Sequence, residues 1–311
     1  MQIDTISIIG LGALGTMYAD FLTRAMPPAS IRVIADEARR TRYEQANLTC
    51  NGKPCSFDYV DPATTGDPAD LVIFAVKYPA LAQAMDDAAN QIGPDTAILS
   101  VMNGIASEEE LAQRFGVEKV LLAVAQEMDA VHEGATTTYT RFGRLALGMP
   151  TVDDGATSQA LSDRLDAVED LFYDVELPFF EPADIRKQLW SKLMCNVGIN
   201  QACMVFNCDY GGVQRGGMAR DNMLGAMRET AAVARAEGID LTEKDIDGWK
   251  HVLDTLSPEG KPSMKQDADA HRPSEVELFG GTVCRLGRAH GIPTPVNDAF
   301  VKRITEMESR Y

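Results

Sequence analysis

Three polar residues in an otherwise apolar stretch have the types and the spacing that could bind and orient a polar ligand. Lys192, Asn196 and Asn200 follow one another at intervals of four residues, and in a helix this spacing places them on one face. Asparagine is a poor helix former, so a stripe that only faces solvent would more often consist of Glu, Gln, Arg and Lys. We therefore predict a binding face on this segment, with a solvent-exposed stripe as the alternative.

A second motif, near the N-terminus, has the spacing of a dinucleotide-binding loop. An apolar strand leads directly into a G-x-G-x-x-G sequence that consists of Gly10, Leu11, Gly12, Ala13, Leu14 and Gly15. The first glycine permits a tight turn, the second lets the backbone approach a pyrophosphate, and the third lets the next helix pack closely. The helix expected from residue 13 to about residue 25 directs its N-terminal amides at the phosphates. The motif predicts a dinucleotide site, with a plain glycine turn as the alternative.

The choice of dinucleotide depends on the residues that follow the second strand. Asp36 ends the expected strand 31–36 and lies 21 residues after Gly15, where an acidic residue commonly binds ribose hydroxyls. This carboxylate suits NADH and would repel the 2′-phosphate of NADPH. Arg39, together with Arg40 and Arg42, begins the next helix and could instead neutralise that phosphate. The carboxylate of Asp36 is fixed at the end of the strand, whereas the arginines would have to move to neutralise the phosphate, so we expect NADH.

Four further candidates lie where strands end or helices begin. Lys77 and Asn103 follow apolar runs that are typical of buried strands, and ligands of open α/β sheets bind at the carboxyl ends of such strands. Ser263 lies near an expected helix start, where its hydroxyl and free backbone amides could hold a carboxylate. Glu275 is expected to open the next long helix, where an acid also complements the helix dipole. The alternatives are a solvated lysine, a turn asparagine, a capping serine and a surface acid.

The composition excludes several classes of protein. The 311 residues carry a net charge of −17, with 45% hydrophobic and 24% charged residues, as in a typical globular protein. The acidic excess argues against nucleic acid or an anionic membrane as a partner. The six cysteines form no metal-ligand cluster with the four histidines, so we expect no metal site and reduced thiols. We find no signal peptide and no long apolar stretch, and we expect a cytoplasmic protein.

Strand and helix patterns alternate in the first part of the chain, and helix patterns alone fill the second. The expected strands are 31–36, 70–76, 97–102 and 120–124, with a hairpin turn at 51–53, an antiparallel ribbon at 136–148 and a helix at 158–172. This alternation is typical of a doubly wound α/β Rossmann sheet, which we expect for residues 1–182. An all-α domain is expected for residues 183–311, with helices at 183–206, 219–237 and from 243.

Together these motifs resemble the ketopantoate reductase (2-dehydropantoate 2-reductase) family over essentially the whole chain. The matching motifs, in order, are the glycine loop, Val76-Lys77, Asn103-Gly104, Lys192 with Asn196 and Asn200, Ser263-Met264 with Asp267, Glu275, and Gly291 to Pro295. The resemblance implies an NAD(P)-dependent oxidoreductase that reduces a small 2-keto acid. It also implies a Rossmann domain and a helical domain, with the active site between them.

By the same resemblance, the candidate residues take roles. Lys192 is the catalytic proton donor, and Ser263 and the catalytic Glu275 fix the carboxylate and hydroxyl of the substrate. The residues implied to bind substrate are Asn103, Asn196, Asn200 and Ser263. Lys77 and Asn103 are implied to lie where cofactor and substrate meet. NADP(H) is the usual cofactor of the family, and a homodimer is the default expectation for such enzymes.

Three features depart from the family. Gly280 stands where asparagine is common, Asp36 replaces an arginine often found after the second strand, and residues 126–133 match poorly. These departures concern the substrate and the choice between NADP(H) and NAD(H) more than the type of reaction. Two alternatives stay open. One is a β-hydroxyacid-type dehydrogenase of the same two-domain class, and the other is a dinucleotide-sensing regulator without catalysis.

Overall fold

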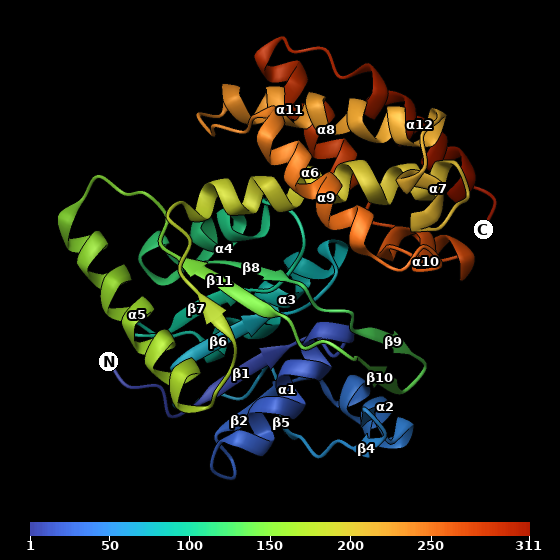
Figure 1. Ribbon diagram of the computed structural model, residues 1–311. Helices are drawn as coiled ribbons and strands as arrows, with labels where there is room; N and C mark the ends of the chain where they lie inside the picture. Colours follow the sequence, from blue (N-terminus) through green and yellow to red (C-terminus); the bar gives the residue numbers. More distant parts are fainter. The chain divides into compact units, whose positions relative to one another are not determined.

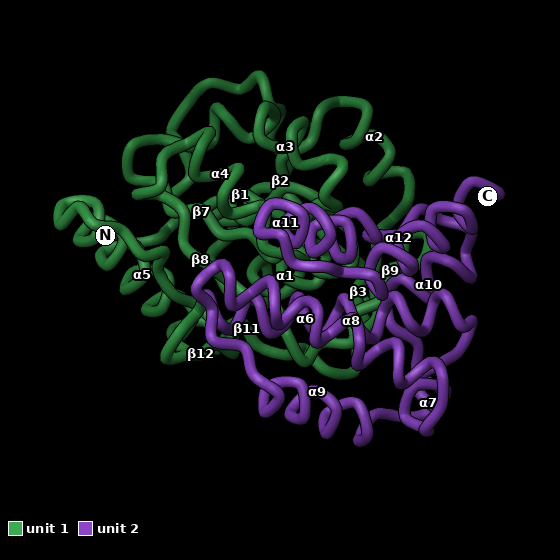
Figure 2. The backbone as a smooth tube through the Cα atoms, turned by 90° about the horizontal axis from the view of Figure 1, so that it is seen from above, with its two compact units in different colours: residues 1–185 green, residues 186–311 purple.

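A computed structural model describes residues 1–311 of the protein. The chain divides into two compact units, Met1–Ile185 (unit 1) and Arg186–Tyr311 (unit 2), which are coloured separately in Figure 2. The division falls close to Pro182, where the strand patterns of the sequence stop. Unit 1 contains all the strands, and unit 2 is helical.

The centre of unit 1 is a five-stranded parallel sheet in the order β5-β2-β1-β6-β7 (Figure 1). Its strands are β1 (Ile6–Ile9), β2 (Ile31–Ile34), β5 (Asp58–Val60), β6 (Leu71–Phe74) and β7 (Ala97–Ser100). When these five strands are numbered along the chain, their order in the sheet is 3-2-1-4-5. This is the order of a dinucleotide-binding Rossmann sheet, and the direction of the strand order reverses between β1 and β6. The predicted fold class is therefore confirmed.

Helices cover both faces of this sheet, which explains why its central strands β1, β6 and β7 are mostly apolar. They are α1 (Ala13–Ala25), α2 (Glu37–Ala46), α3 (Leu81–Ala88), α4 (Ser107–Phe115) and α5 (Gly155–Asp174), with 3₁₀ turns η1 (Tyr78–Ala80), η2 (Ala89–Gln91) and η3 (Val117–Lys119). Successive strand residues point to opposite faces. Ile8 packs in the cluster that contains α1 and α5 residues, whereas Ile9 packs with α3 and α4 residues.

Two small sheets complete unit 1, and they correct two expectations. One sheet joins β8 (Leu122–Gln126), β11 (Arg144–Gly148) and β12 (Phe179–Phe180), and the other joins β3 (Thr49–Cys50), β4 (Lys53–Pro54), β9 (Val131–Glu133) and β10 (Thr136–Thr138). The strand expected at 120–124 therefore lies mainly in a separate sheet, joined to β7 only by a bridge from Val120. The hairpin turn expected at 51–53 forms between β3 and β4.

The ribbon expected at 136–148 does not form, because β10 and β11 belong to different sheets. Between them, Phe142 packs against α1, with its ring centroid 5.6 Å from that of Tyr18 and 4.9 Å from that of Phe21. Gly143 follows with a φ of 72°. The partly buried ring thus packs against the helix in the segment where the ribbon would have turned.

Unit 2 consists of helices joined by short connections. They are α6 (Ile185–Val205, its first residue in unit 1), α7 (Tyr210–Gln214), α8 (Met218–Ala236), α9 (Glu243–Thr255), α10 (Ser263–Asp269), α11 (Thr282–His290) and α12 (Pro295–Glu308), with a π-helical turn η4 (Glu277–Gly281). Thr242 and Asp245 form a capping box that begins α9. The helix expected to open at Pro273-Ser274-Glu275 begins instead with the π-turn at Glu277.

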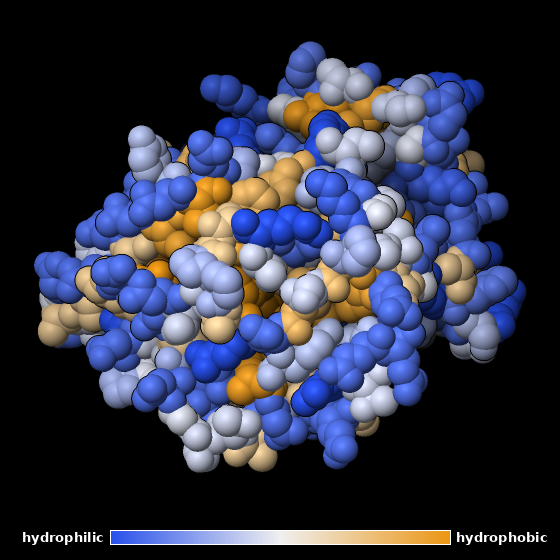
Figure 3. All heavy atoms as spheres, turned by 90° about the horizontal axis from the view of Figure 1, so that it is seen from below, coloured by the Kyte–Doolittle hydropathy of each residue, from blue (hydrophilic) through white to orange (hydrophobic).

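The surface agrees with the charged composition. The face drawn in Figure 3 carries mostly hydrophilic side chains, with smaller apolar areas between them. None of the helices combines the length and the apolar character that a membrane span requires.

Candidate functional site

The glycine loop in unit 1 connects β1 to α1, and its three glycines have distinct environments. Gly10 has a φ of 99°, a conformation that side chains disfavour. A Cβ atom on Gly15 would lie 1.8 Å from the carbonyl oxygen of Gly10, so only glycine lets α1 approach the turn this closely. A Cβ atom on Gly12 would meet no atom within 4 Å. The packing of the chain does not require glycine at Gly12, and an open backbone here fits a bound pyrophosphate.

Lys77 and Asn103 lie at the same edge of the sheet as this loop. The register pairs Ile9 with Phe74, and Phe74 with Ser100, so the ends of β1, β6 and β7 lie side by side. Lys77 and Asn103 each follow three residues after their strand. Unit 1 therefore brings the glycine loop, Lys77 and Asn103 to the carboxyl edge of its sheet, where ligands of this architecture bind.

Asp36 has a structural role that the sequence analysis did not assign to it. It is the N-cap of α2, and its Oδ1 accepts a hydrogen bond of 2.7 Å from the backbone amide of Arg39. Aspartate is among the preferred N-cap residues. The side chain remains 47% exposed, so its second oxygen can still accept a hydrogen bond from a ribose hydroxyl.

Of the three arginines that follow Asp36, Arg39 and Arg40 pair with carboxylates. Arg39 Nη1 is hydrogen-bonded to Asp87 of α3 and lies 3.7 Å from Asp36 Oδ2. The Asp87 hydrogen bond raises the pKa of Arg39. Arg40 pairs with Glu44 at 2.9 Å, and the Arg42 guanidinium lies 5.4 Å from the centre of the Tyr43 ring. A 2′-phosphate would have to draw Arg39 away from Asp87.

In unit 2, three predicted residues form one hydrogen-bonded group. Asn196 and Asn200 are buried on α6, and Asn200 Nδ2 donates to Asn196 Oδ1 at 3.4 Å. Asn200 Oδ1 accepts from Ser263 Oγ at 3.0 Å and from the amide of Met264 at 3.1 Å. The hydroxyl and amide that the sequence suggested for a carboxylate are thus held by an asparagine oxygen at the start of α10.

Lys192 lies on the same helix two turns before Asn200 and is partly exposed. Its ammonium group takes part in no salt bridge of the structure. Its nitrogen lies 5.7 Å from the ring centre of Trp249 of α9, whose indole N–H donates to Ser191 Oγ at 2.8 Å. The sequence analysis missed Trp249, because helical spacing says nothing of a contact between two helices.

Glu275 is partly buried in a bend before the π-turn. Its carbonyl accepts a hydrogen bond of 3.0 Å from the amide of Phe279. Gly280, one of the family departures, lies in the π-turn itself. A Cβ atom on Gly280 would lie 2.2 Å from Gln201 Oε1, so the buried Gln201 side chain occupies the space that a larger residue would need.

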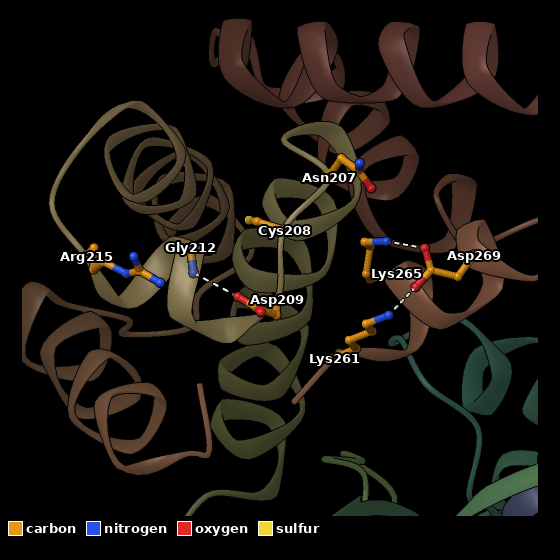
Figure 4. Close-up of a pocket in the computed structure, with 8 residues that line it drawn as sticks. All are labelled: Asn207, Cys208, Asp209, Gly212, Arg215, Lys261, Lys265 and Asp269. Atoms are coloured by element: carbon orange, nitrogen blue, oxygen red, sulfur yellow. Dashed lines mark hydrogen bonds and ion pairs between the residues drawn. The ribbon is translucent and has the colours of Figure 1, made fainter. Parts of the chain in front are cut away.

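A polar hollow of about 670 Å³ also opens in unit 2. It is lined by Asn207, Cys208, Asp209, Gly212, Arg215, Lys261, Lys265 and Asp269 (Figure 4). Lys261 and Lys265 both pair with Asp269, while Arg215 lies on the other side of the Cys208–Asp209 segment. None of the predicted site residues lines this hollow, and both of its lysines are engaged by Asp269. No group of three acidic, histidine or cysteine side chains could hold a metal ion.

Comparison with known proteins gives consistent matches. The family "Ketopantoate reductase PanE/ApbA" matches residues 6–151, and "Ketopantoate reductase PanE/ApbA C terminal" matches residues 184–308. The 2-dehydropantoate 2-reductase of Vibrio cholerae is 26% identical over 310 residues, which cover 98% of both chains.

Solved structures share the fold. The dimeric ketopantoate reductase of Staphylococcus aureus has a TM-score of 0.79 at 22% identity, with coverage of 98% of this chain and 99% of that chain. D-mandelate dehydrogenase with NADH and anilino(oxo)acetate has a TM-score of 0.82 at 22% identity, with the same coverage.

Proposed function

Because this chain belongs to the ketopantoate reductase family and is an NAD(P)-dependent oxidoreductase, we propose that it reduces 2-dehydropantoate or a closely related 2-keto acid. The observation that carries the proposal is the face of α6, where Lys192 has no carboxylate partner and Asn196 and Asn200 join Ser263. A cation next to buried amides suits a substrate that carries both a carbonyl group and a carboxylate.

In this proposal, Lys192 provides the proton. The nicotinamide, when bound, supplies a hydride to the carbonyl carbon of the substrate. Negative charge then develops on the carbonyl oxygen, and an ammonium group within hydrogen-bond reach stabilises it and donates a proton. No carboxylate holds the Lys192 ammonium, so its N–H groups are available to that oxygen.

The start of α10 would bind the carboxylate of the substrate. Ser263 Oγ and the Met264 amide donate to Asn200 Oδ1, and a substrate carboxylate could accept the same two hydrogen bonds. Because a charged acceptor forms stronger hydrogen bonds than a neutral amide oxygen, the exchange favours an anionic substrate. Asn196 would then orient the released Asn200 side chain, and Glu275 would fix the hydroxyl of the product.

The cofactor we propose is NADH, held by unit 1. The open backbone at Gly12 and the start of α1 would hold the pyrophosphate. The exposed oxygen of Asp36 would accept from the ribose hydroxyls. Since Arg39 is engaged with Asp87, it would have to leave that partner to offset the repulsion between Asp36 and a 2′-phosphate.

The experiment that tests the function is oxidation of NADH and NADPH by a panel of 2-keto acids that includes 2-dehydropantoate, followed by absorbance. We expect turnover of at least one 2-keto acid. Activity with only β-hydroxyacids would favour the β-hydroxyacid-type dehydrogenase. Dinucleotide binding without turnover of any substrate would indicate a regulator.

We also propose a homodimer, as stated for the Staphylococcus aureus relative. Light scattering in solution measures this directly. A monomeric mass at working concentration would contradict it.

A further inference from the structure

Helix α9 packs along α6 through two contacts that are one helical turn apart on both helices. Lys187 Nζ lies 3.2 Å from Asp245 Oδ1. One turn later, the Trp249 indole N–H donates to Ser191 Oγ at 2.8 Å. The two contacts run in the same direction along both helices and fix the position of the Trp249 ring on α6.

The face of this ring is the neighbour of the Lys192 ammonium, 5.7 Å from the ring centre. A cation is attracted to the face of an aromatic ring within about 6 Å. Unlike a carboxylate, the ring does not accept strong hydrogen bonds from the ammonium, so the N–H groups stay available. Trp249 therefore holds Lys192 in place without occupying the atoms that would contact a substrate.

The ring lies on a different side of Lys192 from the amides. Asn196 and Asn200 lie further along α6, toward its C-terminal end, and Ser263 of α10 donates to Asn200 there. Trp249 instead donates a hydrogen bond to Ser191, the residue before Lys192. In a bound 2-keto acid, the carbonyl oxygen would lie within about 3 Å of Lys192 Nζ, and the carboxylate would point toward the amides. The other substituent of the carbonyl carbon would then lie on the side of the Trp249 ring.

We propose that Trp249 is a specificity-determining residue, whose indole face contacts the substituent on the carbonyl carbon of the 2-keto acid. This inference rests on the proposed function, because it takes Lys192 as the proton donor. Aromatic rings pack best against other rings and apolar groups. The favoured substrates are therefore 2-keto acids with an aromatic or branched apolar substituent, and pyruvate, with its single methyl group, is a poor one.

The first test uses the ratio of kcat/KM for two substrates within each variant. A general loss of Lys192 positioning lowers kcat/KM for both substrates alike and leaves this ratio unchanged. For the wild-type enzyme, Trp249→Ala and the control Val252→Ala, kcat/KM is measured with phenylglyoxylate and with pyruvate. Val252 lies on the same helix and is 45% exposed. We expect the phenylglyoxylate-to-pyruvate ratio to fall at least about tenfold in Trp249→Ala and to be unchanged in Val252→Ala. An equal loss with both substrates would assign Trp249 a purely structural role and overturn the inference.

The second test needs no turnover. Tryptophan fluorescence is followed while phenylglyoxylate is added to the enzyme with NAD⁺, in the wild type and in Trp249→Phe, which retains only the buried Trp190. We expect saturable quenching in the wild type and its loss in the variant. Equal quenching in both, or none in either, would overturn the inference. A lack of turnover with every 2-keto acid would instead refute the proposed function.

Discussion

Replacing Asp36 by asparagine separates the two roles that the structure gives this side chain. Asparagine caps helices as well as aspartate does, so the hydrogen bond to the Arg39 amide is kept. The negative charge that would oppose a 2′-phosphate is lost. We expect Asp36→Asn to improve the use of NADPH while the stability of α2 is unchanged.

The magnitude follows from the exposure of the side chain. Two unit charges about 4 Å apart repel by about 1 kcal/mol in water, and by about 4 kcal/mol at an effective dielectric constant of about 20. Because the Asp36 side chain is 47% exposed, the lower part of this range applies, about 1 to 2 kcal/mol. Since about 1.4 kcal/mol corresponds to tenfold, kcat/KM for NADPH should rise by about 5- to 30-fold.

The assay is kcat/KM for NADH and NADPH with one good 2-keto acid, together with thermal melting. Asp36→Ala is the matched variant, because it removes the charge and also the cap, which costs about 1 kcal/mol. Both variants should gain NADPH activity, and only the alanine variant should melt at a lower temperature. Asp87→Ala should add to the gain if Arg39, once released, reaches the phosphate.

Two results would refute this reasoning. One is a wild-type enzyme that prefers NADPH by tenfold or more, which would make the arginines the phosphate site. The other is an unchanged ratio of NADPH to NADH activity in Asp36→Asn, which would show that the carboxylate does not face the ribose.

Three further outcomes are expected. Lys192→Ala should lower kcat by about 10²- to 10⁴-fold with little change in cofactor affinity, and near-normal turnover would remove Lys192 from the mechanism. Asn200→Ala should lower the free energy of unfolding by about 2 kcal/mol in chemical denaturation, because two donors at the start of α10 lose their acceptor; no loss would show that water replaces it. Burial raises the pKa of Glu108 from 4.5 to about 7. Between these two pH values the folded chain therefore binds more protons than the unfolded chain. The protonated Glu108 contributes its full stability to the fold below about pH 4.5, and this contribution is lost as the pH rises through 7. Glu108→Gln should therefore melt at a higher temperature than the wild type at pH 8, with a difference that shrinks toward pH 5, and parallel melting curves would contradict this.

The sequence was sufficient for the features that depend on local pattern. Runs that are almost entirely apolar, such as 70–76, predicted strands buried on both faces, and the glycine spacing predicted the turn into α1. The spacing of Lys192, Asn196 and Asn200 predicted one face of one helix. Each of these features depends on neighbours within a few residues, where periodicity is informative.

Features that depend on distant partners could not be predicted in this way. Asn200 contacts Ser263, and Lys192 contacts Trp249, and in each pair the two residues are more than fifty positions apart in the sequence. The segment at 136–148 had the alternation of a ribbon, yet the burial of Phe142 on α1 decided its path. The N-cap at Asp36 could have been predicted from the local sequence, but the same carboxylate was interpreted only as a ligand of the ribose hydroxyls.

The close approach of Gly15 to Gly10 has a consequence for the thermodynamics of cofactor binding. The loop and the start of α1 are packed against each other through contacts within the chain itself. Fixing the backbone of one residue costs about 1 to 2 kcal/mol of conformational entropy, and here that cost is met during folding. The phosphate contacts would then contribute to affinity in full, and Gly15→Ala, by forcing the loop open, should weaken dinucleotide binding even where no contacting atom is removed.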